Sequence, residues 1–248
     1  QSKIIVENDG KNNQVTVAIP NSIVMSVSGA PVVIEDVVSQ FEIHNGELIN
    51  RIKVDNVSLG SQPLASNLES IKSITLGGDK IGTDLTLTAD SMGSYSNINA
   101  SLNLTNWRSE NLIDMLDSIT KFNGTHNADN QLQFLNTLVG LADDGASLSL
   151  KVPGIESAHG VSSLDLSLRY PENNGVTRDN ALSVLENLTG SLNLDTTLND
   201  IQQFVPIMLL QHMASNSFID FDSKTNRVRS EVTLANSIAS INGQQISL

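Results

Sequence analysis

The feature that most constrains this chain is the strict alternation of leucine with small polar residues in several short segments. Between Gly145 and Tyr170, two such runs are joined by a Pro-Gly and a His-Gly pair. Successive side chains of a strand point to opposite faces, so a period of two places all the apolar residues of one run on one face. The apolar positions are Leu148, Leu150 and Val152 in the first run and Leu164, Leu166, Leu168 and Tyr170 in the second. We therefore expect two neighbouring strands whose shared apolar face is covered by other parts of the chain.

The first hundred residues are almost wholly typical of strands. Turn-forming groups separate the strands, and Asn45-Gly46 between two long alternating runs predicts a tight hairpin. The expected strands are Lys3–Glu7, Gln14–Ile19, Ser22–Ser28, Val32–His44, Glu47–Leu59, Ile71–Leu76, Lys80–Ala89 and Ser94–Leu104.

Amphipathic helices are expected in the second half, interleaved with further strands. The helical segments, each with its apolar residues at helical spacing, are Glu110–Phe122, Asp129–Ala142, Thr177–Leu188 and Asn199–Ala214. Pro206 either kinks the last helix or marks its start. The later strands are Gly190–Thr197, Ser217–Asp222, Arg227–Ala235 and Ile238–Ile246.

This order of elements predicts an α+β fold, with a large curved, mainly antiparallel β-sheet packed by three or four amphipathic helices. We expect a single domain over residues 1–248, with a β-rich first half (1–107) and a mixed second half (108–248).

Charge and composition exclude several classes of protein. The net charge of −13, with no basic run, would repel nucleic acid and anionic membrane surfaces. The absence of cysteine excludes disulfides and thiolate chemistry. The longest apolar run, Phe204–Leu210, is far shorter than the roughly 20 residues that span a bilayer. The sequence thus predicts no nucleic-acid partner and no direct membrane insertion by this segment.

No catalytic or metal motif is assembled in the sequence. The histidines His44, His126, His159 and His212 stand alone, without the spacing of a helical zinc motif. No G-x-S-x-G nucleophile elbow occurs. Asp220-Phe-Asp222 is followed by Lys224 where a calcium loop needs an oxygen ligand, so a hairpin is the better interpretation. We expect no catalytic residues, no metal and no cofactor.

One cluster is a candidate for binding. Phe204, Met208 and Met213 lie on the last predicted helix, and Trp107 lies at a strand–helix junction. Methionine and aromatic side chains can line an adaptable apolar groove. The alternative is that these four residues are ordinary core.

From about Ile71 onward, the chain resembles the YdgA-like family of bacterial envelope proteins of unknown function. The matching segments are Lys80–Thr88, Asn97–Thr105, Glu110–Leu116, Ala146–Leu150, Gly160–Tyr170 and the closing stretch Arg227–Ile246, in which a strand runs into Asn242-Gly243. The resemblance implies a periplasmic domain tethered to the inner membrane by an N-terminal helix that this chain does not contain. It implies no catalytic residues.

These observations together predict a non-enzymatic extracytoplasmic domain that acts as a binding or scaffolding module. Its partner would be an amphiphile, a lipid-like ligand or an envelope protein. The alternative is a hydrolase that acts on cell-envelope material through an unmarked serine or carboxylate site. A third hypothesis is assembly through exposed strand edges such as Arg227–Leu234.

Overall fold

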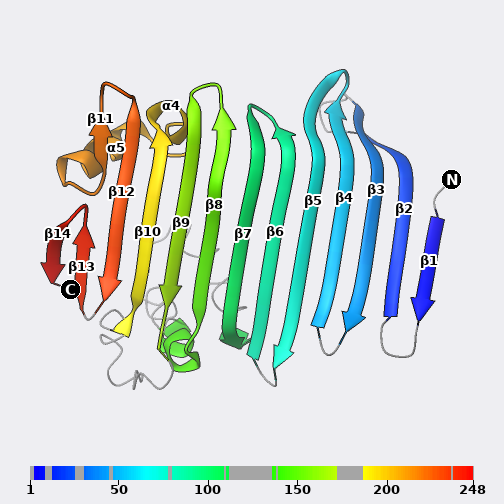
Figure 1. Ribbon diagram of the computed structural model, residues 1–248, viewed down its shortest axis with the longest axis horizontal. Coiled ribbons are helices and arrows are strands. Elements are labelled where there is room, and N and C mark those ends of the chain that lie inside the picture. Colours follow the sequence, from blue (N-terminus) through cyan, green and yellow to red (C-terminus); the bar gives the residue numbers. More distant parts are fainter. Residues whose placement is uncertain are drawn as a thin grey trace.

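The computed structural model describes residues 3–8, 13–25, 31–44, 47–77, 80–108, 110–111, 136–137, 139–171, 187–235 and 237–247. All the strands in these residues belong to one 14-stranded antiparallel sheet (Figure 1). The strands follow one another in sequence order from β1 to β10 and then from β12 to β14, and β11 pairs with the side of β12. The two termini therefore lie at opposite ends of a long sheet.

The strands are β1 (Lys3–Asn8), β2 (Asn13–Met25), β3 (Pro31–His44), β4 (Glu47–Leu59), β5 (Gln62–Gly77), β6 (Lys80–Met92), β7 (Tyr95–Arg108), β8 (Ser147–Ser157), β9 (Gly160–Arg169), β10 (Thr189–Thr197), β11 (Asp220–Asp222), β12 (Arg227–Ala235), β13 (Ile238–Ile241) and β14 (Gln244–Ser247). The helices are α4 (Leu198–Ile201) and α5 (Ile207–Ser215), and residues 139–144 are also helical.

The predicted α+β fold is wrong. Of the described residues, 72% lie in strands and 13% in helices, so the fold is all-β in character. The segment Asn199–Ala214 was predicted as a helix that Pro206 either kinks or starts. It consists of two short helices, α4 and α5, and Pro206 is the N-cap of α5. Segments Glu110–Phe122, Asp129–Ala142 and Thr177–Leu188 lie largely outside the described residues. The described helices are too short to cover a sheet of this width.

Turn chemistry explains most of the meander. Strands β3 and β4 pair from His44 and Glu47 outward, which confirms the hairpin predicted there, although Asn45 and Gly46 lie outside the described residues. The predicted strand Ile238–Ile246 is instead the β13–β14 hairpin. Asn242 and Gly243 form its turn, with φ of 48° and 82°, the positive values that a two-residue hairpin turn needs.

A line of left-handed residues crosses the sheet near one end of the strands. Asp36 in β3, Asn67 in β5 and Asn97 in β7 have φ of 51°, 48° and 53°. The strand registers place Asn67 of β5 opposite Asp55 of β4 on one side and opposite Asp90 of β6 on the other. Asn and Asp tolerate this conformation better than other residues that carry a Cβ. The residues on either side of the line still pair as strand, so the sheet continues through it.

One face of the sheet is apolar along a row that crosses the strands. Residues directly opposite each other in antiparallel strands share a face, so the registers define the row. From β6 to β13 it consists of Leu85, Leu102, Leu150, Leu166, Leu192, Val232 and Ile241. Toward β1 it continues through Lys72 and Asn50 to Phe41, Val15 and Val6. We call this row and the residues two positions either side of it the apolar lane.

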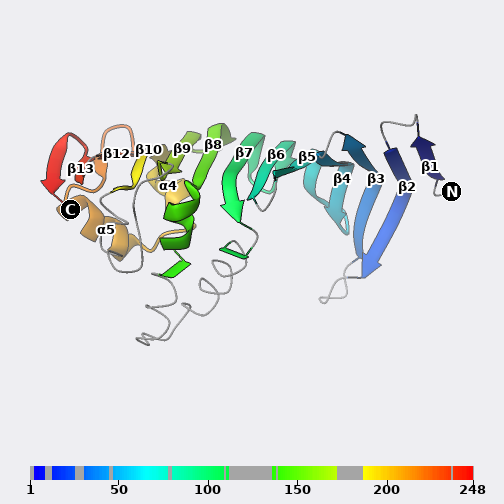
Figure 2. The same cartoon turned by 90° about the horizontal axis from the view of Figure 1, so that it is seen from below.

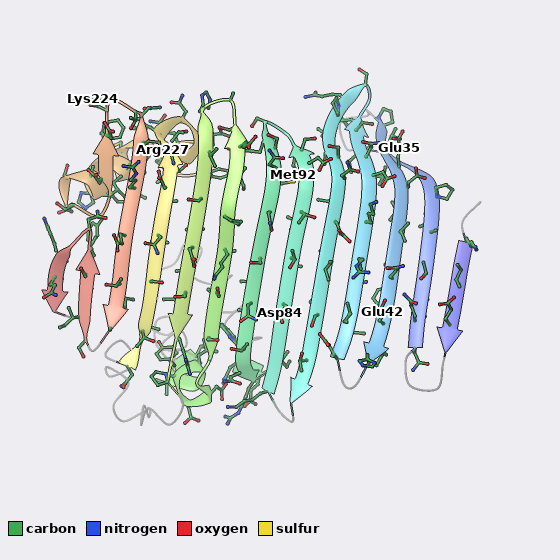
Figure 3. All side chains as sticks on the ribbon, in the orientation of Figure 1. Glu35, Glu42, Asp84, Met92, Lys224 and Arg227 are labelled. Atoms are coloured by element: carbon green, nitrogen blue, oxygen red, sulfur yellow. The ribbon has the colours of Figure 1, made fainter. Side chains whose placement is uncertain are left out.

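The opposite face is more polar, although Ile49 and Ile71 also lie on it. Cross-strand hydrogen bonds join its side chains, and Gln14 donates to Glu42 over 2.9 Å. Asn103 similarly donates to Asp84. Glu42 and Asp84 are labelled on β3 and β6 in Figure 3. The two faces therefore differ as the period-two alternation requires.

The described helices all lie on one side of the sheet, beneath β7 to β13 (Figure 2). One buried cluster joins helical residues 139–142 to Trp107, Ala146 and Tyr170, and Leu104 and Leu148 of the lane pack against it. A second cluster joins Leu210 of α5 to Ile219 and Val228. The first cluster lies at the Trp107 end of β7 and the second at the β11–β12 hairpin end of β12. The helices thus cover the ends of the apolar face of β7–β12.

Candidate functional site

A groove of about 720 Å³, which we call the main groove, lies over the apolar lane. Charged residues also line it: Lys151, Asp165, Asp195, Asp220, Arg229 and Glu231. At its floor lie Val152, Leu164, Leu194 and Ser230, which are neighbours across β8, β9, β10 and β12. Ser217 and Ile219, from the segment between α5 and β11, also line it. Three strands thus present one apolar side chain each to the same open space.

A second hollow of about 470 Å³ is lined by Leu148, Leu168, Gly190 and Leu234 of the lane face and by alternate residues of the same strands, such as Ser149, Ser167 and Ser191. Gly190 is required here, because a Cβ at this position would lie 2.7 Å from Leu168 Cδ2 and 2.6 Å from the Ser167 carbonyl oxygen. The row Leu150–Leu166–Leu192–Val232 runs between the two hollows. The lane is therefore hollowed on both sides of its central row.

The lane is also open toward the N-terminal edge. Ile4 and Val6 of β1 and Phe41 and Ile43 of β3 are exposed, although all four lie on the lane face. Large apolar residues scattered singly on a surface are normal, whereas a contiguous apolar patch marks a site of interaction. The exposed apolar residues of β1 and β3 form a patch of the second kind, and Asn50 and Lys72 separate their row from Leu85.

A buried polar cluster closes one end of the main groove. Asp200 of α4 is only 3% exposed, and its Oδ2 accepts hydrogen bonds from Thr197 Oγ1 at 2.8 Å and Ser157 Oγ at 2.9 Å. Ser162 donates to the same oxygen over 3.3 Å, and Ser162 is two residues along β9 from Leu164. The polar cluster therefore occupies the next row of the lane face. It holds α4 over the ends of β8–β10.

Two buried polar atoms in this cluster have no hydrogen-bond partner among the described residues. They are Asp200 Oδ1 and the hydroxyl of Tyr95. Burial, and to a lesser degree the negative charge of Asp200, raises the pKa of Tyr95 above its usual value of 10.0. The Tyr95 hydroxyl is therefore neutral at physiological pH, and it can only act as a hydrogen-bond donor or acceptor.

A second buried carboxylate fixes the other end. Asp144 Oδ1 forms an ion pair with Arg108 Nε at 3.1 Å, and Asp144 Oδ2 accepts from Asn111 Nδ2 at 2.7 Å. Lys80 Nζ donates to the Asp144 carbonyl oxygen over 2.8 Å. The sequence predicted only that a helix ends at Ala142. The contacts tie that helix end to β6 and β7.

The described histidines do not assemble a catalytic site. His159 Nδ1 lies 3.2 Å from Asn199 Nδ2, and His212 lies beside Asn216. Asp200 contacts hydroxyls, and the structure places no imidazole against it within the described part of the chain. Among those residues, no three His, Cys, Asp or Glu side chains come together as metal ligands. His126 lies outside the described residues.

The four candidate groove residues do not form one cluster. Trp107 is buried beside Tyr170, lines an apolar pocket of about 130 Å³, and donates from Nε1 to the Ser147 carbonyl over 2.8 Å. Met213 packs against the α5 cluster. Phe204 and Met208 are largely exposed. The sequence predicted the leucine stripes that line the main groove, but not that this part of the face is open.

No family model, curated protein or solved structure matches this chain. In the part of the chain that the structure describes, no helix has both the length and the hydrophobicity needed to cross a membrane.

Proposed function

We propose that this chain is a non-enzymatic binding module whose apolar lane binds the hydrocarbon chain of an amphiphile. The observation that supports the proposal most is the row of apolar side chains from consecutive strands, Leu85 to Ile241, flanked by a groove of about 720 Å³. The helices leave this part of the face open.

A hydrocarbon chain fits these features for physical reasons. It needs no directional hydrogen bonds, and Val152, Leu164 and Leu194 on the groove floor offer none. Each buried methylene group contributes roughly 0.8 kcal/mol, so eight to ten methylenes give about 6 to 8 kcal/mol before the cost of ordering the chain. The surplus corresponds to a dissociation constant on the order of micromolar to millimolar.

We also propose that the module acts in the periplasm of a bacterium, where it is tethered to the inner membrane. This location rests on the resemblance to envelope proteins and on the acidic surface rich in neutral polar residues. A role as a scaffold for an envelope protein is the other outcome of the test below.

The test compares a variant of Leu164 on β9 with a variant of Ser101 on β7. Leu164→Gln places a polar group on the groove floor, whereas Ser101→Gln places the same group on the opposite face, at a residue that does not line the groove. The neutral probe N-phenyl-1-naphthylamine fluoresces when it enters an apolar site, and native mass spectrometry detects lipid that co-purifies with the protein. We expect probe binding to weaken about tenfold or more in Leu164→Gln, because roughly two methylene contacts are lost, and to stay unchanged in Ser101→Gln.

The opposite result is equally clear. If the unmodified protein neither binds the probe nor carries a lipid adduct, the amphiphile proposal is wrong and a protein partner replaces it. Equal binding by the two variants would place the site outside the groove.

A further inference from the structure

A second apolar surface lies on the outer side of α5. Phe204 is 77% exposed, Ile207 45%, Met208 78% and Leu209 49%. These four residues, which we call the α5 patch, occupy the first turn of the helix and the turn before it. Leu210 on the same helix is buried against Ile219 and Val228. The patch therefore faces away from the contacts that hold α5 on the sheet.

The segment around the patch carries no formal charge. Residues 201–219 contain no Asp, Glu, Lys or Arg, although the whole chain has a net charge of −13. Glutamines at positions 202, 203 and 211 are the polar neighbours in sequence. In a chain so rich in acidic residues, an uncharged segment with four exposed apolar side chains is the expected form of a contact surface.

The size of the patch argues against a second copy of the chain as its occupant. The exposed fractions correspond to about 500 Å² for side chains of this size, whereas a stable protein interface buries about 800 Å² on each partner. Protein interfaces also carry polar groups that fix the register of the partners. A lipid surface requires neither a matching shape nor a fixed register.

We propose that the α5 patch rests on a lipid surface that has no net charge, such as a zwitterionic bilayer. The net charge of −13 repels anionic lipids, so the attraction is apolar and not electrostatic. Only the side chains of the patch enter the interfacial layer. The proposed contact does not require any segment to cross the bilayer, so it differs from the membrane insertion that the sequence argues against.

The patch lies beside the main groove. Leu210 of α5 packs against Ile219, and Ile219 and Ser217 line the groove. A protein that rests on a lipid surface through α5 therefore holds its groove close to a source of amphiphiles. This link rests on the proposed function, whereas the contact itself rests only on the exposure and charge of the patch.

The test is flotation of the chain with vesicles of phosphatidylcholine, alone or mixed with phosphatidylglycerol. The double variant Phe204→Ser/Met208→Ser removes the most exposed side chains of the patch. The matched control Met92→Ser/Val161→Ser removes two exposed apolar side chains elsewhere. We expect the unmodified chain and the control to float with phosphatidylcholine vesicles. We expect vesicle binding by the patch variant to be at least about tenfold weaker. We expect phosphatidylglycerol to reduce vesicle binding by all three proteins.

Three results would overturn the proposal. The first is that the unmodified chain fails to float with the vesicles. The second is that the patch variant floats as well as the control variant does. The third is a concentration-dependent dimer in sedimentation that the patch variant abolishes, because the patch would then bind a second copy. Leu164→Gln should leave flotation unchanged, and the patch variant should leave probe binding unchanged. Failure of the groove proposal and failure of the membrane proposal are thereby distinguished.

Discussion

Replacement of Tyr95 by phenylalanine should leave the protein at least as stable as before. The Tyr95 hydroxyl is buried without a hydrogen-bond partner among the described residues, and Asp200 stands close enough to raise its pKa. A buried unpaired hydroxyl costs about 1 to 3 kcal/mol. Its removal should therefore raise the free energy of unfolding by about 1 kcal/mol, which is roughly 2 °C in Tm for a chain of this size.

Urea denaturation at neutral pH measures the effect, and Asp200→Ala provides the contrast. Asp200 accepts from Ser157, Ser162 and Thr197, so its removal should cost about 2 to 3 kcal/mol. The double variant shows whether the two residues are coupled. A loss of more than about 1 kcal/mol in Tyr95→Phe, abolished when Asp200 is also absent, would show that Tyr95 donates to Asp200 in solution. The reasoning about an unpaired hydroxyl would then be refuted.

Three other substitutions test the fold around the lane. Trp107→Ala should destabilise the protein by about 3 to 5 kcal/mol, measured by urea denaturation, because it empties the cluster at one end of the lane. Gly190→Ala should lower the free energy of unfolding by about 1 to 3 kcal/mol in the same measurement, because its Cβ would overlap Leu168 and the Ser167 carbonyl. An unchanged urea midpoint would show that β9 and β10 lie farther apart at Gly190 than these distances indicate. Burial raises the pKa of Tyr170 from 10.0 to about 12. The stability due to this shift is complete below pH 10 and is lost as the pH rises through 12, by about 2 to 3 kcal/mol at most. The Tyr170→Phe variant should therefore lose less free energy of unfolding between pH 10 and 12 than the unmodified protein does. An identical dependence of stability on pH in the two proteins would contradict this prediction.

Local patterns in the sequence were sufficient to predict many strands. The alternation of leucine predicted β8 and β9 as neighbours, and the bounds expected for Glu47–Leu59 and Arg227–Ala235 are those observed. The first half of β5 was missed because Pro63 and a run of small polar residues interrupt the alternation. Left-handed residues such as Asp36 and Asn67 gave no signal, since Asn and Asp are equally common in ordinary turns.

The candidate site was only half predictable, because burial is a property of the whole fold. The stripe that contains Leu164 identified one wall of the groove, but local spacing does not show which segment covers a face. The prediction that helices cover this face assumed long amphipathic segments. Pro206 instead breaks Asn199–Ala214 in two, and Phe204 and Met208 point outward while Met213 packs inward.

Photo-crosslinking with an alkyl amphiphile that carries a diazirine in its chain, followed by peptide mapping, tests whether the apolar lane binds a hydrocarbon chain. We expect adducts on the lane face of β8, β9 and β10, at Val152, Leu164 and Leu194. These adducts should be lost when excess unlabelled amphiphile is present. Adducts on the opposite face at Thr86 and Ser101, or none above the background without light, would contradict this expectation.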